Sequence, residues 1–159
     1  MTDAMDWDAA ARRAASVTKA GPPIDRHGLL ELVSSLRQAA ADAPAYVAEV
    51  TGLHEAAQIA ADGPALVVDR ARWASAATET FRAMTDGALP ESRMPGAARL
   101  AGEQLGLVLA LLAGRILGQF DPYVSDEPGR GRLLLVAPNI LTVQRQLDAD
   151  PQDFHLWVS

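Results

Sequence analysis

The sequence predicts a mainly α-helical fold, with five or six helices around one central buried helix and one or two short strands. The first observation is an apolar run from Leu105 to Gly114, the longest in the chain, inside a segment of helical character at 97–119. The second is composition, because 49% of the 159 residues are hydrophobic and only 5% are aromatic, which favours closely packed helices rich in alanine and leucine. The third is that strand features, namely short apolar runs bounded by turn residues, occur only at about 65–68 and 132–137.

The central helix at 97–119 is too short in its apolar part to cross a membrane, which requires about 20 apolar residues. It is therefore expected to be covered by protein on all sides. Small residues recur at every fourth position and form one row along which another backbone can approach closely. Each interior glycine costs roughly 1 kcal/mol relative to alanine, which close packing would offset. Alternatively, glycine and alanine are simply abundant here; the row comprises Gly102, Gly106, Ala110, Gly114 and Gly118.

Capping residues and turn residues delimit the helices of the first third of the chain. Asp6 is a candidate N-cap for a helix over 7–18, which the Gly-Pro-Pro sequence that follows would stop. Asp25 caps a second helix, which Pro44 ends or kinks before a further turn or two. The segment 53–64 is ambiguous.

The middle of the chain predicts a strand followed by a helix. The apolar run at 65–68 is the candidate strand, and Asp69 then begins a helix that ends with Gly87 as its C-cap. A proline-containing loop at 88–95 leads into the central helix. One side of the helix after Asp69 is apolar and carries Trp73, Ala76, Ala77, Phe81 and Met84.

The last third predicts a polar loop, a strand at 132–137 and a helix from Ile140 to about Leu147. Asp150 and Pro151 then have the features of an N-cap and a first helical residue, but the chain ends at Ser159. We therefore expect a single helical domain over 1–159 that is truncated at its C-terminus.

Charge and cysteine content limit the class of protein. The net charge of −6 argues against nucleic-acid binding, which needs a clustered positive surface. The absence of cysteine excludes disulfides and a cysteine-based zinc site. The acidic N-terminus lacks the basic and apolar regions of a signal peptide, so a cytoplasmic protein without membrane contact is expected.

Three isolated histidines are the candidate metal ligands. His54 and Glu55 match the first half of the zinc-protease motif H-E-x-x-H, but Gln58 replaces the second histidine, and its neutral amide is a poor zinc ligand. We therefore expect a surface helical turn there. His27 and His155 are far away in sequence and are expected to be structural or exposed.

A carboxylate cluster is conceivable at Asp121, Asp126 and Glu127, although a solvated loop is the alternative. The phosphate-binding and nucleophile motifs G-x-x-x-x-G-K-[ST], G-x-G-x-x-G and G-x-S-x-G are absent from the sequence. The sequence alone therefore assigns no catalytic, cofactor-binding or metal-binding residue.

Several blocks of the chain resemble successive blocks of one family, the zincin-like hydrolases of high-GC Gram-positive bacteria, also described as zinc-dependent metalloproteases. Some members of that family are labelled as associated with deazaflavin-coenzyme biosynthesis. The resemblance covers nearly the whole chain and is more specific in its second half. The blocks are Trp7-Asp8, Val50-Thr51-Gly52-Leu53, Val67-Val68-Asp69-Arg70 before Trp73, Leu117-Gly118-Gln119-Phe120-Asp121-Pro122, Leu134-Leu135-Val136-Ala137-Pro138-Asn139 and Asp153-Phe154-His155-Leu156-Trp157-Val158.

The resemblance implies zinc and hydrolase activity for full-length relatives, in which the segment similar to 153–159 runs into the helix that carries H-E-x-x-H. This chain ends before that helix, so no zinc ligand or general base can be transferred to it. In zincin-like folds a strand lies along the active-site cleft, and Leu133–Ala137 is either that strand or a buried structural strand.

The expected function is that of the N-terminal portion of a zincin-like, metal-dependent hydrolase, catalytically incomplete as given. The alternative is a free-standing helical scaffold or protein-interaction domain. The expected partner is either the missing C-terminal portion or a second copy bound through exposed apolar surface. A peptide or other small substrate cannot be identified from these residues.

Overall fold

The computed structural model describes residues 4–86, 88–89, 94–124 and 131–147. The chain divides into two compact units, each assembled from two separate stretches of sequence. We call Met1–Ala20 with Asp69–Ile116 the helical unit, and Gly21–Val68 with Leu117–Ser159 the sheet unit. The described residues form six α-helices and one three-stranded sheet, which confirms the predicted mainly helical class.

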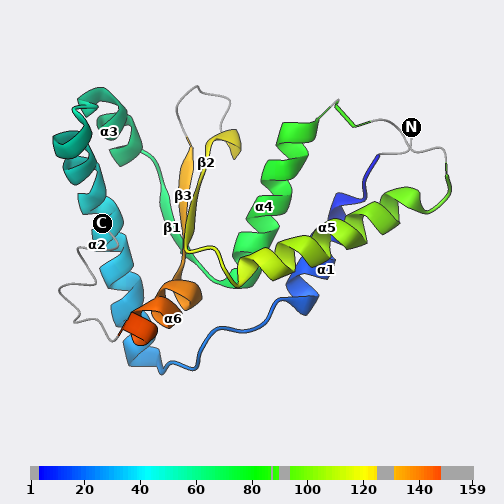
Figure 1. Ribbon diagram of the computed structural model, residues 1–159, viewed down its shortest axis with the longest axis horizontal. Coiled ribbons are helices and arrows are strands. Elements are labelled where there is room, and N and C mark those ends of the chain that lie inside the picture. Colours follow the sequence, from blue (N-terminus) through cyan, green and yellow to red (C-terminus); the bar gives the residue numbers. More distant parts are fainter. Residues whose placement is uncertain (1–3, 87, 90–93, 125–130, 148–159) are drawn as a thin grey trace. The chain divides into compact units, whose positions relative to one another are not determined.

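The helical unit consists of α1 (Trp7–Val17), α4 (Arg70–Thr85) and α5 (Ala97–Ala113), which pack against one another (Figure 1). Two of the predicted N-caps are confirmed here. The Asp6 carboxylate accepts a hydrogen bond from the Ala9 amide at 2.8 Å, and Asp69 accepts one from the Arg72 amide at 2.7 Å. These bonds satisfy amide groups that the first turn of a helix leaves without a partner.

Close contact between α1 and α5 depends on two glycines of α5. A Cβ atom added at Gly106 would lie 2.5 Å from the Ala10 carbonyl oxygen and 2.7 Å from the Arg13 Cβ. A Cβ atom at Gly102 would overlap the carbonyl oxygen of Asp6. The predicted small-residue row is therefore confirmed for these two positions, where the backbones touch.

The predicted row is wrong for Gly114 and Gly118, because α5 ends at Ala113 and not at residue 119. Gly114 is exposed, and a Cβ atom there would have its nearest neighbour, a carbonyl of the same helix, at 4.0 Å. Gly118 lies in a strand of the sheet unit. Pairing with a distant strand thus overrides the local four-residue spacing at that position.

The expectation that the central helix is covered on all sides is also wrong. One side of α5 is buried, and the other exposes large aliphatic side chains, of which Leu111 is 75% exposed and Leu100 is 61% exposed. No charged residue lies between Glu103 and Arg115 on this helix. We call the exposed set the α5 apolar face; it comprises Leu100, Leu107, Val108, Leu111 and Leu112.

The sheet unit contains three strands in the order β1-β3-β2: β1 (Ala65–Val68), β2 (Gly118–Asp121) and β3 (Arg132–Val136). β1 runs parallel to β3, and β2 runs antiparallel to β3. The two predicted strands are confirmed, with β3 ending one residue earlier than expected. β2 is a third strand that was not predicted, because Gly118 and Gln119 had been assigned to the central helix and the next two residues to the segment after it.

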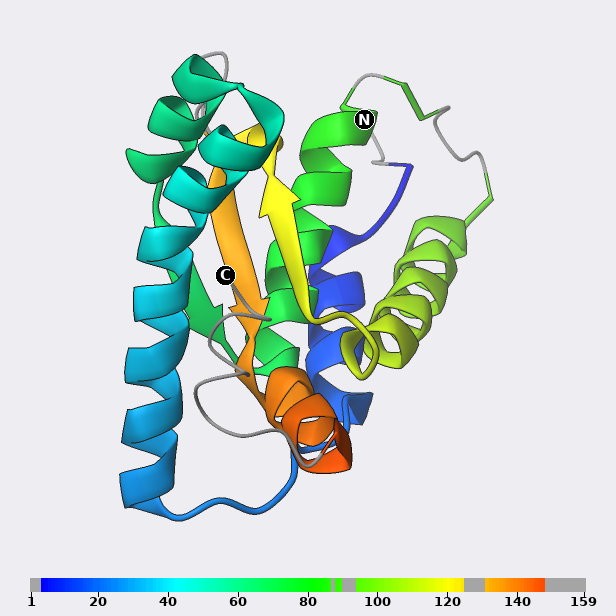
Figure 2. The ribbon, with the colours of Figure 1, turned by 60° about the vertical axis from the view of Figure 1, so that its left-hand side comes forward.

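Three helices complete the sheet unit: α2 (Arg26–Thr51), α3 (His54–Ala61) and α6 (Ala137–Leu147). The predicted cap at Asp25 is confirmed by a bond of 2.8 Å from the Gly28 amide. Pro44 lies inside α2, which continues through it and ends at Gly52, in the left-handed conformation with φ of 72°. α3 then folds back against the end of α2 (Figure 2).

The core of the sheet unit lies between the first half of α2 and α6. α6 begins at Ala137, directly after β3, and not at Ile140 as predicted. The proline at position 138 is accommodated because amides in the first turn need no helical partner. The buried cluster comprises Leu32, Leu36, Ala137, Ile140 and Leu141.

Among the predicted helix boundaries, the C-cap at Gly87 and the N-cap at Asp150 lie outside the described ranges. Among the helices of the described ranges, none is both long and apolar enough to cross a bilayer.

Candidate functional site

The partial zinc-protease motif lies on an exposed turn. His54, Glu55 and Gln58 are all exposed in α3, which confirms the prediction of a surface helical turn. His27 is also exposed, and its imidazole lies 3.3 Å from the Glu31 carboxylate on the same helix. His155 lies outside the described residues.

Asp121, at the end of β2, is completely buried, so its assignment to a solvated loop is wrong. Nε and Nη2 of Arg132 each lie 3.1 Å from its Oδ2 atom, and the Tyr123 amide donates to Oδ1 at 3.1 Å. Because Asp121 and Arg132 are register partners, the ion pair joins β2 to β3 at the end of the antiparallel ladder. Asp126 and Glu127 lie outside the described residues.

The described residues do not fit a zinc site. Zinc in proteins takes three or four histidine, cysteine or carboxylate ligands in close, near-tetrahedral arrangement. Within the described ranges, no three histidine, aspartate or glutamate side chains gather closely enough to hold a metal ion. The Asp121 carboxylate contributes to an arginine pair instead.

The predicted cleft strand is the central strand of the sheet. β3 pairs with β1 on one side and with β2 on the other, so β1 and β2 are the edge strands. A peptide that adds to a sheet needs an edge strand. This arrangement favours the structural alternative for Leu133–Ala137.

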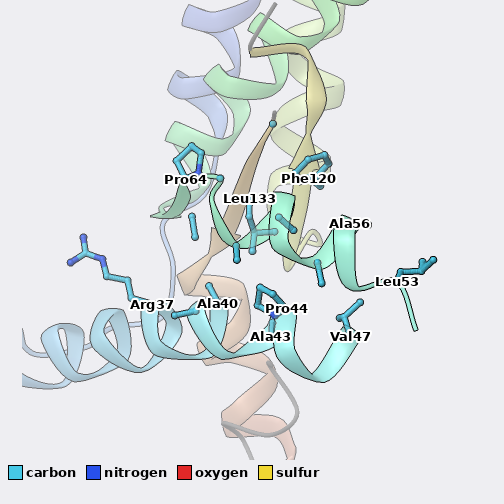
Figure 3. A pocket seen from close by; sticks show the side chains of 17 residues that line it. Arg37, Ala40, Ala43, Pro44, Val47, Leu53, Ala56, Pro64, Phe120 and Leu133 are labelled. Atoms are coloured by element: carbon cyan, nitrogen blue, oxygen red, sulfur yellow. The ribbon is translucent and has the colours of Figure 1, made fainter. Parts of the chain in front are cut away.

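A hollow of about 380 Å³ lies in the sheet unit (Figure 3). Its walls are the second half of α2 and the facing side of α3, and its floor includes Ala65, Leu133 and Phe120. These three residues are register partners on adjacent strands. Eight of the seventeen lining residues are alanine, and Arg37 alone carries a charge. We call this cavity the alanine hollow.

Sequence reasoning missed the alanine hollow, although part of its signal was present. The apolar stripe of α2 continues from Leu32 and Leu36 to Ala40, Ala43 and Val47, so its side chains become smaller along the helix. A loss of side-chain volume along an apolar stripe indicates either a close neighbour or a cavity. Only the placement of α3 decides between these two outcomes.

Comparison with known proteins identifies related chains. The model of the zincin-like metallopeptidase family matches residues 5–159. A solved structure from Chloroflexus aurantiacus, described as a "putative hydrolase with a novel fold", matches with a TM-score of 0.62 and 26% sequence identity over 97% of this chain. That match covers 49% of the Chloroflexus chain, so the present chain spans about half the length of the solved structure that it matches. A search of curated proteins gives no match.

The family match extends over nearly the whole sequence, and it agrees with the resemblance carried by the blocks from Trp7 to Val158. The solved structure is similar in fold over 97% of this chain. This chain therefore belongs to the zincin-like metallopeptidase family.

Proposed function

We propose that this chain is the N-terminal portion of a zincin-like, metal-dependent hydrolase and that it supplies framework rather than catalytic groups. The observation that carries the proposal is the unequal coverage of the structural match, which takes in 97% of this chain and 49% of the Chloroflexus chain. Because this chain corresponds to one half of a larger fold, we place the catalytic groups of that fold in its other half.

The family implies zinc in its full-length members, and the chemistry that zinc supplies is activation of water for hydrolysis. The described residues offer no set of three ligands for that ion. We therefore assign no step of hydrolysis to them. Their proposed role is to hold the elements against which the catalytic portion folds.

The α5 apolar face is the proposed contact surface for that portion. Its five aliphatic side chains are exposed on one side of a helix whose other side packs against α1. Monomeric proteins rarely leave an uncharged apolar patch of this kind uncovered unless it binds a partner. When the catalytic portion is absent, we expect a second copy of this chain to use the same face.

Metal analysis of the purified chain tests the proposal. We expect no stoichiometric zinc after dialysis against equimolar zinc, and no hydrolysis of unstructured peptides. One tightly held zinc per chain would overturn the proposal. The variants His54→Ala and His155→Ala should leave the metal content unchanged, and loss of bound zinc in either would locate the unexpected site.

The alternative function is a free-standing helical scaffold or protein-interaction domain, which the exposed α5 apolar face also supports. Reading the coding DNA beyond Ser159 discriminates between the two. An in-frame H-E-x-x-H supports the hydrolase portion, and a natural stop codon without such a motif nearby supports the interaction domain. Under either function we propose a cytoplasmic location.

A further inference from the structure

The alanine hollow is built by three separate elements and is not an irregularity of one loop. At one end of α2, Leu32 and Leu36 are buried in the core with α6. Further along the same stripe, Ala40 and Ala43 face the alanines of α3, which include Ala57 and Ala60. Alanine methyl groups on both walls leave unfilled the space that pairs of larger side chains would occupy.

Its size and lining fit the hydrocarbon part of a small molecule. Ligand sites commonly enclose about 300–1,000 Å³ and combine apolar walls with a few polar groups. At about 380 Å³ the hollow lies at the lower end of this range. Its lining contains no acidic side chain, histidine or hydroxyl group, so the walls favour an aliphatic or aromatic group.

Arg37 is the single charged residue of the lining, and its positive charge determines which polar head group a ligand would carry. Arg37 lies at one end of the hollow, and its guanidinium group points away from the other lining side chains toward the outside (Figure 3). Among the described residues it has no ion-pair or hydrogen-bond partner. A guanidinium group binds a carboxylate through two parallel hydrogen bonds, which are stronger than bonds between neutral groups.

We propose that the alanine hollow binds a small amphipathic carboxylate. The hydrocarbon tail lies between α2 and α3 against Leu133, and the exposed Arg37 side chain turns toward the mouth of the hollow to hold the carboxylate. The proposed hydrolase function assigns no role to the residues that line this hollow, so a binding measurement tests the hollow independently of hydrolysis.

Methyl-detected NMR titration with decanoate and with 1-decanol, both below their aggregation limits, tests the proposal. We expect saturable decanoate binding, with shifts at the methyl groups of Ala40, Ala57 and Ala60. Ala40→Leu and Ala60→Leu fill the hollow from opposite walls. Each should weaken decanoate binding at least about tenfold, because the leucine side chain occupies the space of several methylene groups of the ligand. Ala45→Leu, at an exposed α2 position outside the hollow, is the matched control and should bind decanoate as the parent chain does.

The head-group assignment is tested by comparing Arg37→Gln with Arg26→Gln, an exposed α2 arginine outside the hollow. Arg37→Gln should weaken decanoate binding about tenfold, as expected for loss of a charged hydrogen bond, and leave decanol binding unchanged. Arg26→Gln should change neither.

Three results of the binding experiments would each overturn the proposal. These are no saturable binding of decanoate, equal binding by the filled and control variants, and equal decanoate affinity of the two arginine variants. A well-dispersed amide spectrum of either Ala40→Leu or Ala60→Leu shows that the variant is folded, so one folded variant is enough. Contacts from another polypeptide segment to the Ala40 and Ala60 methyl groups, without decanoate binding, would also overturn it and assign the hollow to protein packing.

Discussion

At the scale of single residues, Gly106 determines how closely α1 and α5 approach. A leucine there would force its side chain into the Ala10 carbonyl and the Arg13 side chain. Overpacking in a core costs about 1–3 kcal/mol, and here a backbone must move as well. We therefore expect Gly106→Leu to lower the free energy of unfolding by at least about 3 kcal/mol, measured by chemical denaturation.

Gly114→Leu is the matched control for that substitution. The four-residue spacing in the sequence predicts a similar loss at Gly114, but the structure leaves open space around this residue. We now expect a change below about 1 kcal/mol, as for an ordinary surface substitution. Equal losses in the two variants would show that the close contact between α1 and α5 is not the cause.

The buried Asp121–Arg132 pair gives a second prediction at this scale. Asp121→Asn keeps an acceptor for the Tyr123 amide but removes the buried carboxylate charge that pairs with the Arg132 guanidinium. Removing one partner of a buried ion pair costs about 3–5 kcal/mol. Thermal or chemical unfolding measures this loss.

The half-exposed pair between Arg13 and Glu103, at 3.5 Å, supplies the comparison. Exposed pairs contribute about 0–1 kcal/mol because water screens them. Glu103→Gln should therefore change stability far less than Asp121→Asn. If both substitutions have the same small effect, Asp121 is not part of the framework that joins β2 to β3.

At the scale of elements, the α5 apolar face predicts self-association. Five exposed aliphatic side chains on one helix face offer roughly several hundred Å² of apolar surface. Burial returns about 25 cal/mol per Å², so association is favoured by several kcal/mol before entropy losses. We expect dimers or larger assemblies in analytical ultracentrifugation at high protein concentration.

Leu111→Glu, which places a charge on the most exposed residue of this face, should shift the chain to monomer. Leu30→Glu, at a 59% exposed position on α2, is the control and should leave the association unchanged. A monodisperse parent chain that binds no apolar dye would contradict this prediction and favour a self-sufficient helical domain.

At the scale of the whole molecule, the proposed contact between the α5 apolar face and a catalytic portion gives a further prediction. If the coding sequence continues in frame beyond Ser159, the extended polypeptide should be monomeric and should hold one zinc ion. Light scattering and metal analysis on the same sample measure both properties. If the extended polypeptide still self-associates as strongly as the present chain, the α5 apolar face is not the surface that contacts the catalytic portion.

The two units of the chain were not visible in the sequence. The chain passes from one unit to the other three times, after residues 20, 68 and 116. The crossing after residue 68 lies between the end of β1 and Asp69, which caps α4. Sequence reasoning looks for long polar linkers between units, and none marks this junction. The expectation of a single domain over 1–159 stays a prediction.

The sequence by itself determined the elements that depend on local interactions. Asp6, Asp25 and Asp69 were identified as N-caps because each carboxylate bonds an amide three residues ahead in the same chain segment. The apolar runs of β1 and β3 were likewise recognisable from their own residues. The absence of a metal-ligand pattern could be stated from composition and spacing, but the location of a cavity could not.

The tertiary structure decided what depends on residues far apart in sequence. Gly118 to Asp121 form β2 and do not extend α5, because β3 supplies hydrogen-bond partners more than ten residues away. Asp121 is buried because Arg132 compensates its charge. The alanine hollow exists because α3 folds back beside α2 and places a second set of small side chains opposite the first. A periodic pattern reports which side of an element is apolar, but only the positions of the other elements determine whether that side is covered.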